Sequence, residues 1–328
     1  MELYADLAWL LPAPADFRAQ RRALLAEGAA NLGPAIYQLA KYALSPTQLT
    51  QLADAITELR ARGADLSPLT PFKLGIVGNG TLDLIAPALI ASAARHGVLL
   101  EVVTGDYGQV IQEALNPQGR VNAAKPDAVL LALDYRGVPL QVELSTAAAS
   151  VKEATGFINA LKENFKANSG AVCIVQTLAA PAEGLFGSFD RRTDAAQKAA
   201  VDAFNRAIAA GTEGSTDILL DVAGLAETVG LGNWHSPSEW NLAKLPFTSI
   251  FLPLYADHVG RLIGAMRGKA RKVLVLDLDN TCWGGVIGDD GMDGIRLAEG
   301  DAASVPGARR ASARTRASSS SRSNGLGR

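Results

Sequence analysis

The protein has 328 residues, a length that suits two domains better than one of average size. Apolar residues make up 48% of the chain and charged residues 20%, which excludes global disorder and predicts a sizeable buried core. The 31 Lys and Arg residues nearly balance the 33 Asp and Glu residues, so no whole-chain field attracts nucleic acid or anionic membranes.

The cysteines and the first residues indicate a cytoplasmic protein. Cys173 and Cys282 are the only two cysteines and stand far apart, unlike the closely spaced set of a disulfide scaffold. The chain begins without a basic leader, and no apolar run reaches the roughly 18 residues that span a bilayer. We therefore expect neither a membrane nor a nucleic-acid partner.

Residues 1–68 show a helical pattern. Ser45-Pro46-Thr47-Gln48 has the order of a capping box with proline at the first helical position. The apolar residues that follow recur at helical spacing: Leu49, Leu52, Ile56 and Leu59. This spacing predicts an amphipathic helix with one buried stripe.

Residues 69–265 change to short apolar runs separated by helical stretches. The predicted strands are Leu74–Val77, Leu99–Val103, Ala128–Leu133, Val172–Val175 and Ile218–Asp221. The predicted helices are Leu84–His96, Thr146–Phe165 and Thr193–Ala210. Apolar strands that alternate with helices are typical of a parallel sheet covered on both faces. The pattern therefore predicts a doubly wound α/β domain.

A second α/β unit begins in residues 266–300. Val273–Leu276 predicts a buried strand after a basic linker, and Asp277 follows that strand at its carboxyl end. In open α/β sheets this edge is where ligands bind.

Residues 301–328 differ abruptly in composition. They hold six Arg and seven Ser, and their only large aliphatics are Val305 and Leu326, so they cannot form a core. One interpretation is a basic tail that binds phosphate-rich partners. The other is a change of reading frame in GC-rich coding DNA, and we expect this second explanation to hold.

The run Asp277-Leu278-Asp279-Asn280-Thr281 carries the clearest chemistry. Two carboxylates at positions i and i+2 beyond a strand end can point into one cleft, where one attacks phosphorus and the other transfers a proton. The pair also suits a hard divalent cation such as Mg²⁺. The alternative is a pair of aspartates that only caps the following helix.

The wider stretch from Val273 to Gly291, VLVLDLDNTCWGGVIGDDG, resembles the FkbH-like proteins of subfamily IIIC in the haloacid-dehalogenase (HAD) superfamily. Upstream segments that also resemble this family are Gly78-Asn79-Gly80-Thr81, Gly105–Gln109 and Trp240–Thr248. The resemblance implies an enzyme that takes a glyceryl unit from 1,3-bisphosphoglycerate, removes phosphate and loads the three-carbon acyl group onto an acyl carrier protein in polyketide-type pathways.

The resemblance also implies roles at single positions. Asp277 would be the nucleophile and a Mg²⁺ ligand, Asp279 the general acid/base and a second ligand, and Thr281 would orient the first aspartate. The family pattern further requires a downstream Ser or Thr on the phosphoryl oxygens, a Lys and more acidic ligands. None of these follows in recognisable context.

Two neighbours of the motif have alternative interpretations. Cys282 could carry the glyceryl group as a thioester beside the phosphoryl site, or could be a small core residue. Trp283 is expected to line the substrate pocket or to pack in the core.

The upstream domain resembles SGNH hydrolases, which use an early Ser nucleophile and a late Asp-x-x-His pair. Asn79 and Thr81 stand near the position of that nucleophile, yet no serine is present there. His235 could be the late histidine, but Gly232 occupies the place of its aspartate. We therefore expect a binding or docking domain. Its candidate cleft residues are Asn79, Thr81, Asp106, Tyr107, Gln109, Trp234, His235, Trp240 and Lys244. His96 and His258 are assigned no function.

Three functions remain open at this point. The first is glyceryl loading by an FkbH-like enzyme, and the second is a simple HAD phosphatase of a small phosphorylated metabolite. The third is a non-catalytic module that docks a carrier protein.

We predict that this chain shows no measurable Mg²⁺-dependent phosphatase activity. The groups that clamp phosphate and neutralise its charge act together with Asp277, and they are missing from residues 278–328. Phosphate release from an acyl phosphate measures this directly. Robust release that Asp277→Asn abolishes would contradict the prediction.

Overall fold

The computed structural model describes residues 7–140, 147–193 and 195–269, and beyond these residues 273, 275, 277–280 and 282–295. It divides into two compact units. The first contains residues 12–269, and the second contains Trp9–Leu11 and the described residues after Lys269. The predicted tail at 301–328 lies outside the described residues.

The described part of the chain starts with short elements and one long helix. These are β1 (Leu11–Pro12), α1 (Phe17–Leu24), α2 (Leu32–Ala40), β2 (Tyr42–Ala43) and α3 (Pro46–Ala61). The capping box at the start of α3 is present: the Gln48 amide donates to Ser45 Oγ at 3.3 Å, and the Ser45 amide donates to Gln48 Oε1 at 2.9 Å. The predicted apolar stripe of α3 is buried.

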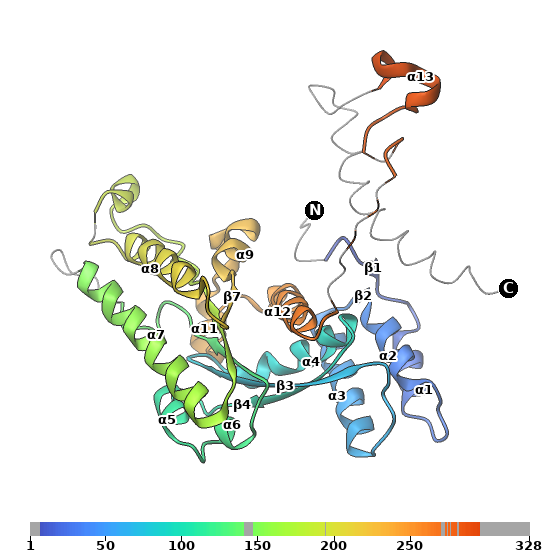
Figure 1. Cartoon of the computed structure of the whole chain (residues 1–328), viewed down its shortest axis with the longest axis horizontal. Helices are drawn as coiled ribbons and strands as arrows, with labels where there is room; N and C mark the ends of the chain where they lie inside the picture. The colour runs from blue at the N-terminus through green and yellow to red at the C-terminus, as the bar shows by residue number, and fades with distance from the viewer. Residues whose placement is uncertain are drawn as a thin grey trace. The chain divides into compact units, whose positions relative to one another are not determined.

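A five-stranded parallel sheet forms the centre of the first unit (Figure 1). Its strands are β3 (Thr70–Gly78), β4 (Val98–Thr104), β5 (Ala128–Ala132), β6 (Val172–Gln176) and β7 (Ile218–Leu220). They lie in the order β4-β3-β5-β6-β7. The five predicted apolar runs are therefore strands, with two corrections at their ends. Strand β5 ends at Ala132, before Leu133, and Asp221 follows β7, where its carboxylate accepts the Gly224 amide at the start of the next helix.

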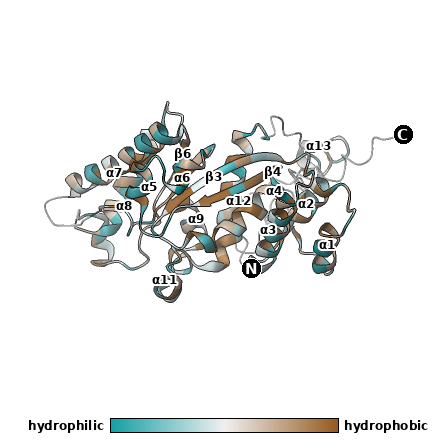
Figure 2. Cartoon of the chain, turned by 90° about the horizontal axis from the view of Figure 1, so that it is seen from below, coloured by the Kyte–Doolittle hydropathy of each residue, from teal (hydrophilic) through white to brown (hydrophobic). Residues whose placement is uncertain are grey.

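Helices connect successive strands of the sheet or follow its last strand, β7. They are η1 (Leu82–Leu84), α4 (Ala86–Arg95), α5 (Val110–Leu115), α6 (Arg120–Ala123), α7 (Ala147–Ser169), η2 (Gly187–Arg191), α8 (Gln197–Thr212), α9 (Val222–Val229), α10 (Leu231–Trp234), α11 (Pro237–Ala243), η3 (Ser249–Phe251) and α12 (Leu252–Met266). Those from α9 onward follow β7. In Figure 2, teal and brown residues alternate along α3 and α7, as expected for helices with one buried face.

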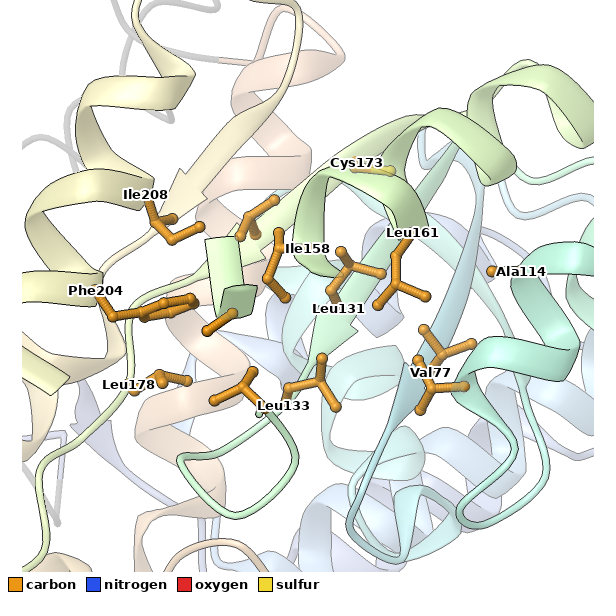
Figure 3. Close-up of a cluster of buried hydrophobic side chains, with 14 of the residues drawn as sticks. Val77, Ala114, Leu131, Leu133, Ile158, Leu161, Cys173, Leu178, Phe204 and Ile208 are labelled. Carbon is orange, nitrogen blue, oxygen red and sulfur yellow. The ribbon is translucent and has the colours of Figure 1, made fainter. Parts of the chain in front are cut away.

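Alternation along the strands sends side chains to both faces of the sheet. Val77, Leu131 and Val175 are in register and face the core that α7 and α8 cover, where Figure 3 shows Ile158, Leu161, Phe204 and Ile208. On the opposite face Ile76, Leu130 and Ile174 are equally buried. Because both faces of the sheet are covered, most side chains on both sides of the strands are apolar.

A buried charge cluster joins α4 to α12 on that opposite face. Asp257 is fully buried, and its Oδ1 lies 2.8 Å from Nη1 of Arg95 and 2.9 Å from Nε2 of His96. Arg261 pairs with the other carboxylate oxygen at 2.7 Å. Burial alone raises the pKa of Asp257, but the His96 hydrogen bond and the charges of Arg95 and Arg261 outweigh it and hold that pKa well below its usual range.

Arg95 extends this cluster to the N-terminal helices. Its Nε donates to the carbonyl oxygen of Ala40 at 2.7 Å and its Nη2 to that of Tyr42 at 3.2 Å. The guanidinium thereby satisfies carbonyls where α2 ends. Gly260 and Gly264 allow α12 to approach closely, because a Cβ at these positions would lie 3.0 and 3.1 Å from His96 atoms.

The described part of the second unit contains one helix, α13 (Ile287–Gly294), which is interrupted by Gly291 at φ 67°. The buried strand predicted at Val273–Leu276 is wrong at the described positions, since Val273 and Val275 are 76% and 84% exposed and lie in no strand. A parallel strand needs neighbours for its backbone hydrogen bonds, and the described residues provide none here. No helix among the residues described is long and apolar enough to cross a membrane.

We predict that Asp257→Asn lowers the free energy of unfolding by about 3–5 kcal/mol at pH 7, because it leaves Arg95 buried without its anion. The loss should shrink in acid. The stability that comes from the lowered pKa of Asp257 is fully present above the ordinary value, about 3.9, and the wild type loses it progressively as the pH falls below that value toward the lowered pKa. Urea unfolding at several pH values measures this. Glu58→Gln, which breaks the exposed Glu58–Arg62 pair, is the control and should cost under about 0.5 kcal/mol. Equal losses for both variants would contradict the prediction.

Candidate functional site

The carboxyl edge of the sheet has one topological switch point. The chain runs from β3 to β4 on one side and then returns to β5 on the other side. Ligands of open α/β sheets bind outside the strand ends at such a point. The residues that follow β3 and β5 are therefore the first candidates for a site.

Asn79 and Asp134 tie these two strand ends together. Asn79 Nδ2 donates to Asp134 Oδ1 at 2.7 Å, and the Asp134 amide donates to Asn79 Oδ1 at 2.9 Å. Gly137 accommodates the pair, because a Cβ there would lie 2.5 Å from Cγ of Asn79. A carboxamide thus occupies the end of β3, and it supplies hydrogen bonds but no nucleophile.

Arg136 lies between two aromatic rings next to this pair. Its guanidinium carbon is 4.4 Å from the ring centre of Tyr135 and 4.3 Å from that of Trp240. Nη1 of the same side chain is 2.5 Å from Asp134 Oδ2. Burial raises the pKa of Tyr135, so its hydroxyl stays protonated at neutral pH. Stacking and the ion pair therefore hold the guanidinium in one plane.

Lys244 lies directly after α11, the helix that contains Trp240. It follows α11 in the left-handed conformation, at φ 52°, and its carbonyl oxygen accepts the Thr81 amide at 3.1 Å. Its Nζ lies 5.4 Å from the centre of the Trp240 ring. The predicted residues Asn79, Thr81 and Lys244 are in this way brought to the same edge.

His235 is fixed in one tautomer. Its Nε2 lies 2.8 Å from the carbonyl oxygen of Ala180, which can only accept, so Nε2 carries the proton. Nδ1 is then an acceptor, and it is buried without a partner among the described residues. Burial lowers the pKa of His235, so the ring is neutral at pH 7. The ring meets Tyr135 edge-on, with centroids 6.0 Å apart.

This histidine does not complete a hydrolytic triad among the described residues. Its Nε2 proton is directed at a backbone carbonyl, and no carboxylate partner holds its Nδ1. Together with the amide of Asn79, this arrangement suits binding rather than nucleophilic attack.

Other predicted cleft residues have different roles. Trp234 is wrong as a cleft residue, because it is 1% exposed and stacks on Phe247 and Phe251 in the core. Asp106 is exposed and pairs with Arg120 at 3.1 Å. His96 belongs to the buried Asp257 cluster.

Asp134, Tyr135 and Arg136 are site residues that the sequence did not predict. They come directly after the third predicted strand. This position at a strand end is the feature of the sequence that could have identified them as site residues. Only the order of strands in the sheet shows that this strand lies beside β3, which makes its end part of the switch point.

Asp279 organises the loop of the second unit. Its Oδ1 accepts Nε1 of Trp283 at 3.0 Å and the amide of Ile287 at 3.2 Å. Asn280 turns the chain at φ 52°, and its Oδ1 accepts the Gly285 amide at 3.0 Å. One carboxylate oxygen thus orders the loop from Trp283 to α13.

The remaining motif residues lie around this loop. Cys282 is exposed, which excludes the core interpretation for it within the described residues, and its Sγ lies 3.6 Å from the Asp277 carbonyl oxygen. Trp283 contacts Asp279 through its indole nitrogen rather than packing in a core. Thr281 lies outside the described residues.

The metal predicted at Asp277 and Asp279 fits the residues only in part. Carboxylate oxygens are ligands that Mg²⁺ prefers. Asp279 Oδ1 already accepts two hydrogen bonds. The described residues contain no group of three or more His, Cys, Asp or Glu side chains that could hold a metal. The two aspartates would therefore supply only part of the coordination shell that the predicted Mg²⁺ requires.

A separate open pocket of about 200 Å³ lies between α3, α4 and β4. Its lining includes Asp54, Asp83, Ile90 and Val102 and contains none of the predicted site residues.

Comparison with solved structures reveals a relative in fold. The model is similar to the crystal structure of the N-terminal part of a Bacteroides fragilis protein that contains a phosphatase domain, complexed with Mg, at a TM-score of 0.66 and 20% identity. The match covers 79% of this chain and 66% of that one, so the chain spans just under two thirds of its length. At this identity the likeness concerns the fold.

Two further structures align more loosely. One is a GDSL-like lipase from Bacteroides thetaiotaomicron (TM-score 0.33, 13% identity, 68% of this chain and 100% of that chain). The other is a mutant of an acetylxylan esterase from Geobacillus stearothermophilus (TM-score 0.34, 15% identity, 61% and 95%). No family model matches the chain, and no curated protein matches it.

We predict that Asn79→Asp destabilises the first unit by roughly 2–4 kcal/mol at pH 7, because it sets a second carboxylate against buried Asp134. Like charges raise the folded-state pKa of one carboxyl group, so the penalty should fade as the pH drops below that raised value. Asn79→Ala is the matched control, with a loss that does not change over this pH range. Thermal unfolding between pH 4 and pH 8 compares the two, and a pH-independent deficit for Asn79→Asp would refute the prediction.

Proposed function

We propose that this protein is FkbH-like: with a complete HAD domain it would handle phosphoryl groups at Asp277 and Asp279 and load a glyceryl unit from 1,3-bisphosphoglycerate onto an acyl carrier protein in the cytoplasm, whereas we expect the present chain by itself to be inactive. The main support is the run Asp277-Leu278-Asp279-Asn280-Thr281 within its longer FkbH-like context. The likeness in fold to a structure whose description names a phosphatase domain and Mg agrees with this proposal.

In the proposed phosphoryl step, the Asp277 carboxylate attacks the phosphorus of the phosphate ester. The bond between phosphorus and the glyceryl oxygen breaks, and Asp279 gives its proton to that oxygen. Asp279 then takes a proton from water, which hydrolyses the aspartyl phosphate and restores Asp277. The two hydrogen bonds on Asp279 Oδ1 leave Oδ2 as the oxygen that exchanges the proton.

In the proposed acyl step, Cys282 carries the glyceryl group. Its thiolate attacks the acyl carbon, the bond to the acyl phosphate oxygen breaks, and inorganic phosphate leaves with the electron pair. The thiolate of the carrier then attacks this thioester, its bond to the acyl carbon forms as the Cys282 sulfur–carbon bond breaks, and the Cys282 thiolate is regenerated. The exposure of Cys282 and its position beside the Asp277 backbone support this role.

Asp277 and Asp279 would hold Mg²⁺, which neutralises charge on the phosphoryl oxygens when bound. The remaining phosphate-binding groups of the family pattern would have to come from residues that this sequence does not show. We propose that the first unit is an SGNH-like binding or docking domain.

We predict that, in a protein whose sequence after codon 300 carries the complete HAD pattern, Asp277→Asn abolishes both phosphate removal and glyceryl loading. An amide is a poor nucleophile and a weaker metal ligand than a carboxylate. The assay combines phosphate release with intact-mass measurement of the carrier protein. A glyceryl adduct on the carrier in Asp277→Asn would refute the role of this residue.

Cys282→Ala separates the two steps in the same protein. It should keep phosphate release and lose the adduct on the carrier. Cys173→Ala is the matched control and should keep both, because burial raises the pKa of the Cys173 thiol to about 12 and leaves it without a thiolate. Normal carrier loading by Cys282→Ala would end the thioester step. Phosphate release without any carrier adduct in the unmodified protein would favour a simple phosphatase.

A further inference from the structure

Two cations flank one indole ring at the carboxyl edge of the first unit. Arg136 lies 4.3 Å and Lys244 5.4 Å from the ring centre of Trp240. Both cationic groups therefore lie close to the same ring. Neither residue belongs to the aspartate motif of the second unit.

The charges of this cluster are only partly balanced. Arg136 pairs with Asp134, whereas Lys244 has no carboxylate within ion-pair distance among the described residues. Glu183 acts on the neighbouring Tyr135 and His235 through its charge but forms no ion pair with Lys244. His235 is neutral at pH 7. The ammonium group is thus the uncompensated charge beside the ring.

The guanidinium of Arg136 is prepared to bind an anion. It lies over the rings of Tyr135 and Trp240, and Asp134 accepts a hydrogen bond from its Nη1. The planar fork of a guanidinium has five N–H donors, so N–H groups beyond Nη1 can match two oxygens of one anionic group. A clamped guanidinium loses little further side-chain entropy when it binds.

We propose that the carboxyl edge of β3 and β5 in the first unit binds a small organic anion, whose oxyanion group, a carboxylate or a phosphate, is held by Arg136 and Lys244 beside Trp240. Asn79 and Asp134 act as positioning residues, because they fix the strand ends and the guanidinium. This site is independent of the proposed phosphoryl chemistry at Asp277.

The four tryptophans of the chain allow a test that locates the bound anion. The indole N–H resonance of Trp240, assigned with Trp240→Phe, is followed by NMR while inorganic phosphate or acetate replaces chloride at constant ionic strength. We expect a saturable shift of Trp240, with the buried Trp234 much less affected. A shift with phosphate alone indicates a phosphate-bearing ligand, and a shift with both anions indicates that a carboxylate suffices.

Variants decide whether the cluster is responsible. Lys244→Gln should weaken the Trp240 response about tenfold, the loss expected for one charge-assisted hydrogen bond. Lys152→Gln removes an exposed lysine of α7 and should change nothing. Lys244 is chosen because Arg136→Gln would leave Asp134 buried without its cation.

Three results would overturn the proposal. One is a Trp240 resonance that moves with neither anion, and another is an equal response in Lys244→Gln and Lys152→Gln. The third is a shift confined to Trp283 that Asp277→Asn removes, since this places phosphate at the aspartate motif. A normal Trp240 response in Asp277→Asn supports the site whatever the outcome for glyceryl loading.

Discussion

Parallel strands expose no face to solvent, and this constraint governs the first unit. The sheet is stable only when helices bury both of its faces. On one face α7 and α8 cover Val77, Leu131 and Val175, and on the other face α4 and α12 pack together. The register of β3 with both β4 and β5 follows from this double coverage, and it sets the carboxyl edge where Asn79 and Asp134 meet.

The face of the sheet under α4 and α12 contains the buried carboxylate of Asp257, at a position where an apolar side chain could also pack. Asp257 binds Arg95, and Arg95 in turn binds carbonyl oxygens at the end of α2. A buried ion pair adds little net stability compared with well-packed apolar groups, but it penalises every arrangement that separates its members. The cluster therefore specifies how the N-terminal helices attach to the sheet. The contact with Asp257 accounts for the presence of His96 at this position without a catalytic role.

The two units present different sets of side chains. The first presents an amide, a guanidinium over aromatic rings and an ammonium group that has no carboxylate partner among the described residues, a set that suits recognition better than bond breaking. The second presents two aspartates and an exposed cysteine in a loop that Asp279 orders, which favours group transfer. A protein that both recognises an acidic small molecule and transfers part of it would use both properties.

The sequence by itself determined the α/β class, the five strands and the capped helix α3, because these depend on local apolar runs and on the residues at their ends. It also identified the aspartate motif, whose spacing is itself the chemical signal. Tertiary structure alone decided that the end of β5 lies beside that of β3, which brought Asp134, Tyr135 and Arg136 next to Asn79. It also decided that Asp257 meets Arg95 across 162 positions of the chain and that Trp234 belongs to the core. Strand order and long-range pairing depend on which surfaces pack together, and no local pattern of residues contains that information.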